Sequence, residues 1–524
     1  MRRLLARLLP PLPLILPAIA SGFFATLCFP PVSAWPLAFV ALVPMLVALA
    51  TARPSRADAF KTGFLFGVAF YLTLLWWVAK LIPTAGATIP WILVPALVVM
   101  SLYLSLYPAL FALGVGWLSG YRVAALALAA PGLWVLIDVL RSSGELAFPW
   151  GALGYALSDI PSLTQSAAAF GMNGLTFLVV LVNVLVALAY VARRTRARVL
   201  AAACALVVVG AMWTHGKREL SRVDALVSAT PDVARVAVAQ PNVDLALKWK
   251  REYRDSTMLT IERLAEEAAG VGAKLIVFPE TAAPFYIESS DRVYRERLHD
   301  LARGLGAHIF IGFLDHRYDG PGGALDVYNS SGLFSPDGAL DKYDKNHLLP
   351  FGEQLPLSSR LRWLRKIDFG QANFQPGPKT RPIAMNGTAF TPLICFESVF
   401  SYLCRRGVRE GSEMFVNITN DGWFGDTPGP FQHAQMAILR AVEFRRFLVR
   451  SANSGVSMIV DPAGRVATSL GLYRQGILVA DVTLLDTETF YSRHGDVPLL
   501  VLCVALVVLG TVLGRRHRAF LPKR

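Results

Sequence analysis

Charged residues are scarce in this chain of 524 residues. They make up 17% of the sequence, against about 25% in typical soluble domains, whereas 54% of the residues are hydrophobic. Five cysteines are too few for a disulfide-dense scaffold, and the abundance of apolar residues excludes a disordered chain. The scarcity of charge therefore indicates a protein with much of its chain in lipid.

Acidic residues are the scarcer of the two signs of charge. There are 37 Asp and Glu against 51 Lys and Arg, which gives a formal net charge of +14. On a soluble protein this excess would favour nucleic-acid binding. Here the basic residues lie mostly beside apolar segments, which indicates membrane topology instead. We therefore expect a polytopic membrane protein with no nucleic-acid partner.

Apolar runs close to the roughly 20 residues that cross a bilayer recur along the chain. They lie at about 8–29, 35–51, 59–79, 88–118, 122–141, 160–191, 197–213 and 497–514. Ala18-Ile19-Ala20, after a basic start, imitates a signal-peptidase site, so cleavage of the first run is an alternative. The apolar run continues through Phe23 and Phe24, which favours a retained span.

Positive charge predicts the orientation of these spans. With a cytoplasmic N-terminus, the loops expected outside carry little beyond Lys80 and Arg141. The loops and tail expected inside carry the basic residues Arg53, Arg56, Lys61, Arg122, Arg193, Arg194, Arg196, Arg198, Arg515, Arg516 and Arg518. Seven spans then place the segment that follows them outside the cytoplasm.

The composition changes between the seventh and the eighth run. We expect residues 1–219 to be a membrane domain with about seven transmembrane helices, 220–490 an α/β catalytic domain, and 491–524 a final transmembrane helix with a basic cytoplasmic tail. Short apolar runs indicate buried strands at Ala234–Gln240, Lys274–Phe278, His308–Phe313, Thr391–Cys395 and Glu413–Thr419. Periodicity predicts helices at Tyr253–Ala269, Asp291–Leu305 and Phe431–Arg450, and a hairpin turn at Asp461-Pro462-Ala463-Gly464.

Three motifs with chemically useful side chains follow expected strands. A carboxylate, Glu280, and a cysteine, Cys395, each stand at the end of a strand, where α/β folds place ligands. Each of these residues has an ordinary alternative when taken singly: Glu280 as an acid at a helix start, Lys345 as a surface lysine and Cys395 as a small buried apolar residue. The motifs are Phe278-Pro279-Glu280-Thr281, Tyr343-Asp344-Lys345-Asn346-His347-Leu348-Leu349-Pro350-Phe351-Gly352-Glu353 and Leu393-Ile394-Cys395-Phe396-Glu397-Ser398.

Taken together, Glu280, Lys345 and Cys395 resemble the Glu-Lys-Cys triad of the nitrilase superfamily. The resemblance extends to the strings Asn420-Asp421-Gly422-Trp423-Phe424-Gly425, Phe431-Gln432-His433, Arg440-Ala441-Val442-Glu443 and Arg450-Ser451-Ala452-Asn453-Ser454-Gly455. A nitrilase-like domain between membrane spans resembles the apolipoprotein N-acyltransferase family of bacterial envelopes. It implies a polytopic α-helical membrane domain joined to an extracytoplasmic α/β domain with the nitrilase αββα sandwich.

The resemblance also implies a role for each site residue. Glu280 would be the general base for the Cys395 thiol, and Lys345 would stabilise the oxyanion beside the backbone N–H of Phe396. Glu353 would hold Lys345 in place or take part in proton transfer, and Glu397 would support the site. The family often has tyrosine where Phe396 stands; a backbone role survives this change.

The substrates follow from the same resemblance. A phospholipid would donate its acyl chain to the cysteine, and the α-amino group of a diacylglyceryl-modified N-terminal cysteine of an apolipoprotein would accept it. Trp249, Trp423 and Phe424 are candidate contacts for acyl chains, with core packing as the alternative. His347 has no His or Cys partner at ligand spacing, so we expect neither metal nor cofactor. We expect a monomer.

Two other functions fit part of the sequence. A membrane-tethered amidase or nitrilase acting on small C–N substrates would carry the same triad. A lipid-binding or transport scaffold would leave the intact triad unexplained, and its spans would be expected to hold more charge than Asp138. Cys404 lies nine residues after Cys395, and a disulfide between them would consume the proposed nucleophile.

Overall fold

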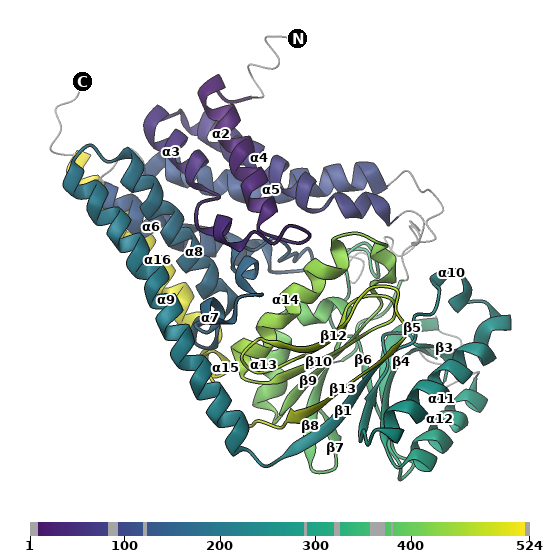
Figure 1. Cartoon of the computed structure of the whole chain (residues 1–524). Coiled ribbons are helices and arrows are strands. Elements are labelled where there is room, and N and C mark those ends of the chain that lie inside the picture. The colour runs from purple at the N-terminus through teal and green to yellow at the C-terminus, as the bar shows by residue number, and fades with distance from the viewer. Residues whose placement is uncertain are drawn as a thin grey trace. The chain divides into compact units, whose positions relative to one another are not determined.

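A computed structural model describes residues 9–81, 93–118, 123–287, 291–318, 325–356, 373–378 and 381–518. Residue 8 of the first expected span, residues 88–92 of the fourth and Arg122 lie outside the described residues. The chain divides into two compact units (Figure 1). One comprises Met1–Ala79, Trp91–Leu220 and His494–Arg524, and the other Lys80–Pro90 and Ser221–Arg493.

The first unit is helical. Its helices are α2 (Leu12–Leu27), α3 (Val43–Ala52), α4 (Arg56–Leu74), α5 (Leu93–Leu118), α6 (Val123–Arg141), α7 (Pro161–Thr164), α8 (Ala167–Val191), α9 (Thr195–Ala229, which continues into the second unit) and α16 (Val497–Arg518). Short 3₁₀ turns η1 (Trp35–Phe39), η2 (Trp76–Lys80) and η4 (Leu153–Leu157) join them. Each expected span therefore contains helix.

Four helical segments are long and apolar enough to cross a membrane: Trp35–Ala52, Leu93–Leu118, Ala167–Val191 and Thr195–Ala229. Leu12–Leu27 and Val497–Leu513 are shorter apolar helices. These segments identify the chain as a membrane protein. The count of eight spans and their orientation stay predictions.

Small residues and one buried ion pair organise the helical unit. A Cβ on Gly63 of α4 would stand 2.3 Å from the carbonyl oxygen of Pro108 in α5, so glycine permits this close helix packing. Asp138, the main charged residue inside an expected span, accepts hydrogen bonds from Arg141 Nε and Nη2 at 3.0 and 2.8 Å. Its charge is therefore paired, as burial in an apolar region demands.

The second unit contains two β-sheets. The seven-stranded sheet has the order β13-β1-β2-β4-β5-β6, with β3 paired to β4, and the six-stranded sheet has the order β12-β11-β10-β9-β8-β7. The strands of the first are β1 (Val233–Gln240), β2 (Leu275–Val277), β3 (Ala283–Tyr286), β4 (His308–Tyr318), β5 (Leu325–Phe334), β6 (Leu340–Asp344) and β13 (Gly476–Thr483). Those of the second are β7 (Ile383–Met385), β8 (Thr388–Ile394), β9 (Met414–Thr419), β10 (Phe447–Ala452), β11 (Ser457–Val460) and β12 (Val466–Leu470).

Alternation along the strands packs the two sheets against each other. Val236 and Val238 of β1 point into a core shared with Val416 and Ile418 of β9, whereas Ala237 lies in the core on the opposite face. Within the shared core, Phe310 of the first sheet meets Phe390 of the second edge to face at 5.1 Å. The two sheets therefore form the centre of a sandwich.

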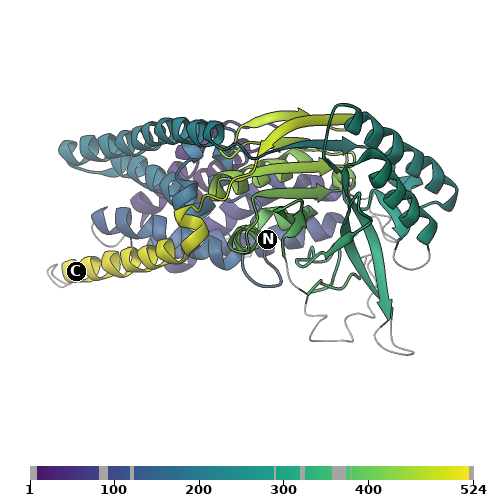
Figure 2. The same cartoon turned by 90° about the horizontal axis from the view of Figure 1, so that it is seen from below.

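Helices cover both outer faces of the sandwich (Figures 1 and 2). Met258 and Ile261 of α11 (Arg254–Gly270) and Leu298 of α12 (Arg292–Leu305) pack on the first sheet. On the second sheet, Phe444 at the end of α14 (Gly429–Phe444) meets Phe415 of β9 at 5.7 Å, and α13 (Ser401–Arg409) contacts β8. The order helix, sheet, sheet, helix is the expected αββα fold. Two short helices complete the unit, α10 (Leu245–Lys248) and α15 (Phe490–His494).

Most expected strands and helices occur, but the helix predicted over Phe431–Arg450 is wrong at its C-terminal end. Helix α14 ends at Phe444 because Arg445 adopts a left-handed conformation with φ of 52°. The next residues pair in parallel with β9 as β10. Apolar side chains over 447–449 suit a buried strand as well as a helix, so periodicity alone did not separate them. The predicted hairpin turn is confirmed between β11 and β12, where Gly464 has φ of 85°.

Candidate active site

Three strand ends bring the sequence-predicted residues Glu280, Lys345 and Cys395 to one site. Glu280 follows β2, Lys345 follows β6, and Cys395 follows β8 of the other sheet. Lys345 Nζ lies 3.8 Å from Glu280 Oε1, and the charges of both residues act on the Cys395 thiol. The site therefore draws on both sheets of the sandwich.

Both carboxylate oxygens of Glu280 are fixed by hydrogen bonds. Asn329 Nδ2 of β5 donates to Oε1 at 2.7 Å, and the backbone N–H of Asn420 donates to Oε2 at 2.8 Å. Burial raises the pKa of Glu280, and the nearby charge of Lys345 opposes this rise. A buried carboxylate with a raised pKa is a better proton acceptor than an exposed one.

Lys345 is almost completely buried, at 1% exposure, and pairs with Glu353 at 2.8 Å. Burial alone would lower the pKa of Lys345, but the negative charges of Glu353, Cys395 and Glu280 raise it above its ordinary value. The lysine therefore holds its positive charge in the site. Asn329 Nδ2 also donates to Glu353 Oε1 at 3.1 Å and so links the two acids. We call Glu280, Asn329, Lys345 and Glu353 the acid–base cluster.

The loop that carries the lysine, residues 345–353, is closed by the same Glu353. Its Oε2 accepts from the backbone N–H of Leu349 at 2.8 Å, across the Pro350-Phe351-Gly352 turn in which Phe351 has φ of 63°. The side chain of Glu353 thus both holds Lys345 and closes its loop, as the predicted role of Glu353 requires. That role in catalysis stays a prediction.

Cys395 occupies a sharp turn between β8 and a short 3₁₀ helix, Cys395–Val399. Its φ is 53°, a left-handed conformation that non-glycine residues seldom adopt outside functional turns. The residue is half-buried, and burial together with the charge of Glu280 raises the pKa of its thiol. The resting sulfur is therefore a neutral thiol that needs a base when it reacts. Phe396 follows in this elbow, its ring 5.0 Å from that of Phe400.

Glu397 joins the cysteine elbow to the lysine loop. Its Oε2 accepts from the backbone N–H of Ile394 at 2.8 Å. Its Oε1 accepts from the Tyr343 hydroxyl at 2.7 Å and from the backbone N–H groups of Asn346 and His347 at 2.8 and 3.0 Å. Glu397 is fully buried. With its oxygens occupied by four donors, it is placed to support the site and not to act as the base.

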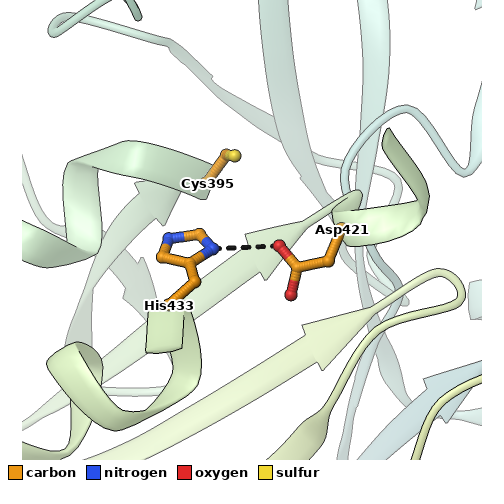
Figure 3. Close-up of side chains that lie close together, drawn as sticks. All are labelled: Cys395, Asp421 and His433. Atoms are coloured by element: carbon orange, nitrogen blue, oxygen red, sulfur yellow. Dashed lines mark hydrogen bonds and ion pairs between the residues drawn. The ribbon is translucent and has the colours of Figure 1, made fainter. Parts of the chain in front are cut away.

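A second group of buried ionisable residues adjoins the cysteine (Figure 3). Cys395, Asp421 and His433 offer atoms within 4.8 Å of one another, and His433 Nδ1 lies 2.9 Å from Asp421 Oδ1. Arg450 Nη2 donates to Asp421 Oδ2 at 2.8 Å, and Thr419 Oγ1 donates to Oδ1 at 2.9 Å. We call Asp421, His433 and Arg450 the aspartate–arginine cluster.

The charges within the aspartate–arginine cluster neutralise each other. Burial would raise the pKa of Asp421, but the charge of Arg450 and the hydrogen bond of His433 lower it to about 2. Burial and Arg450 lower the pKa of His433, so its ring is neutral. Sulfur, imidazole and carboxylate are metal-ligand types. Both Asp421 oxygens already accept hydrogen bonds, one from a guanidinium, and this arrangement suits a structural network better than a metal.

The surroundings of His347 and Cys404 bear on two alternatives raised by the sequence, namely metal binding by His347 and a disulfide between Cys404 and Cys395. His347 Nδ1 hydrogen-bonds the hydroxyl of Tyr402 at 2.7 Å, its ring lies 3.9 Å from Phe400, and burial lowers its pKa to about 4. Cys395 and Cys404 are both free thiols, and Cys404 is fully buried. The disulfide that would have blocked the nucleophile is thus not formed between these described residues.

The three candidate acyl-chain contacts have different settings. Trp249 is 44% exposed, which excludes core packing as the reason for its position. Trp423 and Phe424 are half-buried, and the Phe424 ring lies 6.2 Å from that of His433, beside the cysteine. Contact of these aromatic residues with lipid stays a prediction.

Sequence reasoning assigned no role to Asn329, Asp421, His433 or Arg450. Asn329 lies in β5, a strand that was not predicted from the sequence, so the need of its buried amide for hydrogen-bond partners could not be recognised. The other three stand inside the motif strings that carry the resemblance. Their pairing was hidden because the partners come from three separate elements.

The comparisons with known proteins cover both units. The family model described as the apolipoprotein N-acyltransferase N-terminal domain matches residues 21–185, and that of carbon-nitrogen hydrolases matches residues 235–491. Among curated relatives, the apolipoprotein N-acyltransferase of Geobacter metallireducens is 35% identical over 96% of this chain and 95% of its own. Those of Brucella melitensis and Haemophilus influenzae are 34% and 30% identical, over 96% and 95% of this chain and 96% and 94% of theirs.

Solved structures resemble about half of the chain. A mutant of the nitrilase-superfamily amidase from Nesterenkonia AN1 covers 52% of this chain and 98% of its own, with 20% identity and a TM-score of 0.38. A carbon-nitrogen hydrolase superfamily protein from Xanthomonas campestris covers 52% of this chain and 97% of its own, with 17% identity and a TM-score of 0.37.

The αββα sandwich, with its cysteine at a strand-end elbow beside a glutamate and a lysine, defines an enzyme of the carbon-nitrogen hydrolase class. The helical unit and the relatives over nearly the whole chain then narrow the class. The chain belongs to the apolipoprotein N-acyltransferase family.

Proposed function

We propose that this protein transfers an acyl chain from a membrane phospholipid to the α-amino group of the diacylglyceryl-modified N-terminal cysteine of an apolipoprotein. The observation that carries the proposal is the acid–base cluster, buried beside a half-buried cysteine in a chain with helices long and apolar enough to cross a membrane. The names of the relatives support the acceptor class. The phospholipid donor and the diacylated state of the acceptor are what the family resemblance implies.

The first half-reaction forms a thioester. Cys395 Sγ attacks the acyl ester carbonyl while Glu280 accepts the thiol proton. Lys345 and the backbone N–H of Phe396 stabilise the oxyanion. When the intermediate collapses, the C–O bond breaks, and Glu280 returns the proton to the leaving alcohol, which departs as lysophospholipid.

The second half-reaction uses the same groups in reverse. The amine attacks the thioester carbonyl, a C–N bond forms, and the C–S bond breaks. Glu280 takes a proton from the amine and returns it to the sulfur, so that the enzyme ends as it began. Glu353 keeps Lys345 in place throughout, because its 2.8 Å ion pair needs no change between the steps.

Trp249, Trp423 and Phe424 are proposed to hold the acyl chains. The exposed ring of Trp249 offers apolar area to a lipid tail. Replacing it by alanine should raise the phospholipid concentration needed for half-maximal acylation and leave the chemical step little changed. A fall in the acylation rate at saturating lipid, with this concentration unchanged, would contradict this role.

We propose that the protein works as a monomer in the bacterial inner membrane with its catalytic domain, residues 220–490, in the periplasm. Residues 1–219 and 491–524 would then contribute seven spans and one span. Reporter fusions after Arg196 and after the exposed Asp337 should report opposite sides of the membrane. If both report the cytoplasm, the topology and access to periplasmic lipoproteins fail together.

Mass spectrometry of a lipoprotein N-terminus from cells with and without this protein tests the function directly. An amide-linked third acyl chain should be present only where the protein is active. A small-amide hydrolase would instead release ammonia from amides and leave the lipoprotein unchanged, and a scaffold would do neither.

A further inference from the structure

A second lysine, from α10 and not from the lysine loop, contacts the turn that carries Glu280. Lys248, at the end of α10, is 1% exposed, and its Nζ donates to Thr281 Oγ1 at 2.7 Å and to the carbonyl oxygen of Glu280 at 3.3 Å. We propose that Lys248 is a positioning residue that holds the Glu280–Thr281 turn and stabilises the carboxylate form of Glu280. The proposal deepens the proposed function, since it uses the pairing of Glu280 with Cys395.

The turn that Lys248 holds is strained and closely packed. Thr281 has φ of 48°, a left-handed conformation that is an outlier for a β-branched residue. On its other side β4 passes so close that a Cβ on Gly312 would stand 2.5 Å from the Thr281 nitrogen and 2.7 Å from Glu280 Cα. A strained conformation persists only where the surroundings enforce it. Lys248 supplies two hydrogen bonds to this turn.

The charge of Lys248 acts on the same acid. Glu280 faces Lys345 and Glu353 from the lysine loop, Asn329 from β5 and Lys248 from α10. Lys345 lies closer to Glu353, at 2.8 Å, than to Glu280, at 3.8 Å. Burial lowers the pKa of Lys248 to about 7, and the charge of Glu280 opposes that change. Loss of Lys248 therefore raises the pKa of Glu280 and leaves less of it as carboxylate near neutral pH.

Lys248 contacts both the Glu280–Thr281 turn and the exposed residue Trp249. Its Nζ lies 5.7 Å from the centre of the Trp249 ring, a cation–π distance, and that ring is 44% exposed. A lipid contact on Trp249 would thus be made next to the group that holds Glu280.

Alkylation of Cys395 by iodoacetamide tests the proposal without any lipid. In this reaction sulfur displaces iodide and the thiol proton passes to Glu280. The full-length protein in detergent is treated across pH 5.5 to 9, and the Cys395 peptide is quantified by mass spectrometry. We call the fall of the alkylation rate on the acidic side of the pH profile its acidic limb. In Lys248→Met the midpoint of this limb should move to a pH about one unit higher, which is the lower end of the pKa change that a neighbouring opposite charge causes. Lys248→Arg should restore the wild-type limb, and the exposed neighbour variant Lys250→Met should not move it.

A merely structural role predicts a different result. If Lys248→Met lowers the rate by one factor at every pH and leaves the limb in place, the proposal is overturned. If that variant does not fold, judged by its thermal unfolding, Thr281→Val removes one acceptor and keeps the branched shape. It should move the limb in the same direction by a smaller amount, and an unmoved limb overturns the proposal. A shifted limb in a protein that acylates no lipoprotein would sink the proposed function and leave this inference standing.

Discussion

The two buried clusters beside Cys395 differ in how their charges are matched. In the aspartate–arginine cluster one carboxylate meets one guanidinium at 2.8 Å, and the pKa of Asp421 falls to about 2. In the acid–base cluster two carboxylates share Lys345, and the pKa of Glu280 is raised. The Asp421–Arg450 pair keeps the same protonation state across the physiological pH range. The acid–base cluster, in contrast, contains a carboxyl group, Glu280, that can gain or lose a proton. We therefore expect the chemistry on the Glu280 side of Cys395 and structural support on the Asp421 side.

The largest effect on activity is expected from Glu280→Gln. The amide cannot accept the thiol proton, and burial already raises the pKa of Cys395, so little thiolate forms without the base. Loss of general-base catalysis lowers rates by about 10²–10⁴, and acylation should fall at least to the lower part of that range. Acyl-enzyme formation from labelled phospholipid measures it, with the exposed Glu266→Gln as control. Retention of more than a tenth of the wild-type rate would remove Glu280 from the role of base.

Lys345→Ala should have the next largest effect. It removes the buried positive charge that the oxyanion needs, and loss of one such donor costs about 10²–10³ in rate. The exposed Lys274→Ala serves as the matched control. Both half-reactions should slow, because each passes through a tetrahedral oxyanion. If only the amine step slows, the lysine acts on the acceptor and not on the oxyanion.

Arg450→Met should act on stability more than on chemistry. It leaves the Asp421 carboxylate buried without its partner, which typically costs about 3–5 kcal/mol. Arg465→Met breaks the solvent-exposed pair with Asp224 and should cost no more than about 1 kcal/mol. Chemical unfolding in detergent measures both. The folded fraction of Arg450→Met should keep the wild-type pH limb for Cys395 alkylation, and a shifted limb would show that the two clusters are not separate in function.

The pH dependence of stability has a definite sign for Asp421. Its folded pKa of about 2 lies below the ordinary aspartate value of about 3.9. The cluster therefore stabilises the fold at pH above about 4, and this contribution is lost as the pH falls toward 2.

Cys404→Ala should have the smallest effect. The thiol is buried and free, so its removal leaves a small cavity, with a cost near the typical 1 kcal/mol of a point substitution. Activity per folded molecule should match the wild type, with and without reductant. A gain of activity on reduction that Cys404→Ala abolishes would revive the disulfide.

The sequence predicted the parts of the site that sit at strand ends. Glu280 and Cys395 are each preceded by a short apolar run, and a buried strand ends where polar residues begin. Lys345 instead follows the mixed sequence Leu340-Asp341-Lys342-Tyr343-Asp344, and the long motif around it carried the prediction. Glu397 was predicted to be a supporting group; it accepts four hydrogen bonds from the two loops, and its role stays a prediction. In these places local pattern and tertiary structure agree.

The rest depends on contacts between distant segments. The hydrogen bond from Asn420 to Glu280 spans 140 residues, and that from Lys248 to Thr281 spans 33. No pattern in the local sequence predicts hydrogen-bond partners so far apart in the chain. The end of α14 was missed for another reason, because a left-handed arginine at 445 stops the helix where glycine, the usual signal, is absent.

The most direct test of the account is the covalent intermediate. Purified protein is incubated with phospholipid labelled in its acyl chain, without acceptor, and then treated with hydroxylamine. The wild type should carry label that hydroxylamine removes, Cys395→Ala should carry none, and Cys395→Ser should carry at most a slowly formed oxygen ester that transfers poorly to an amine. Absence of label from the wild type, or label that persists on Cys395→Ala, would contradict the thioester mechanism.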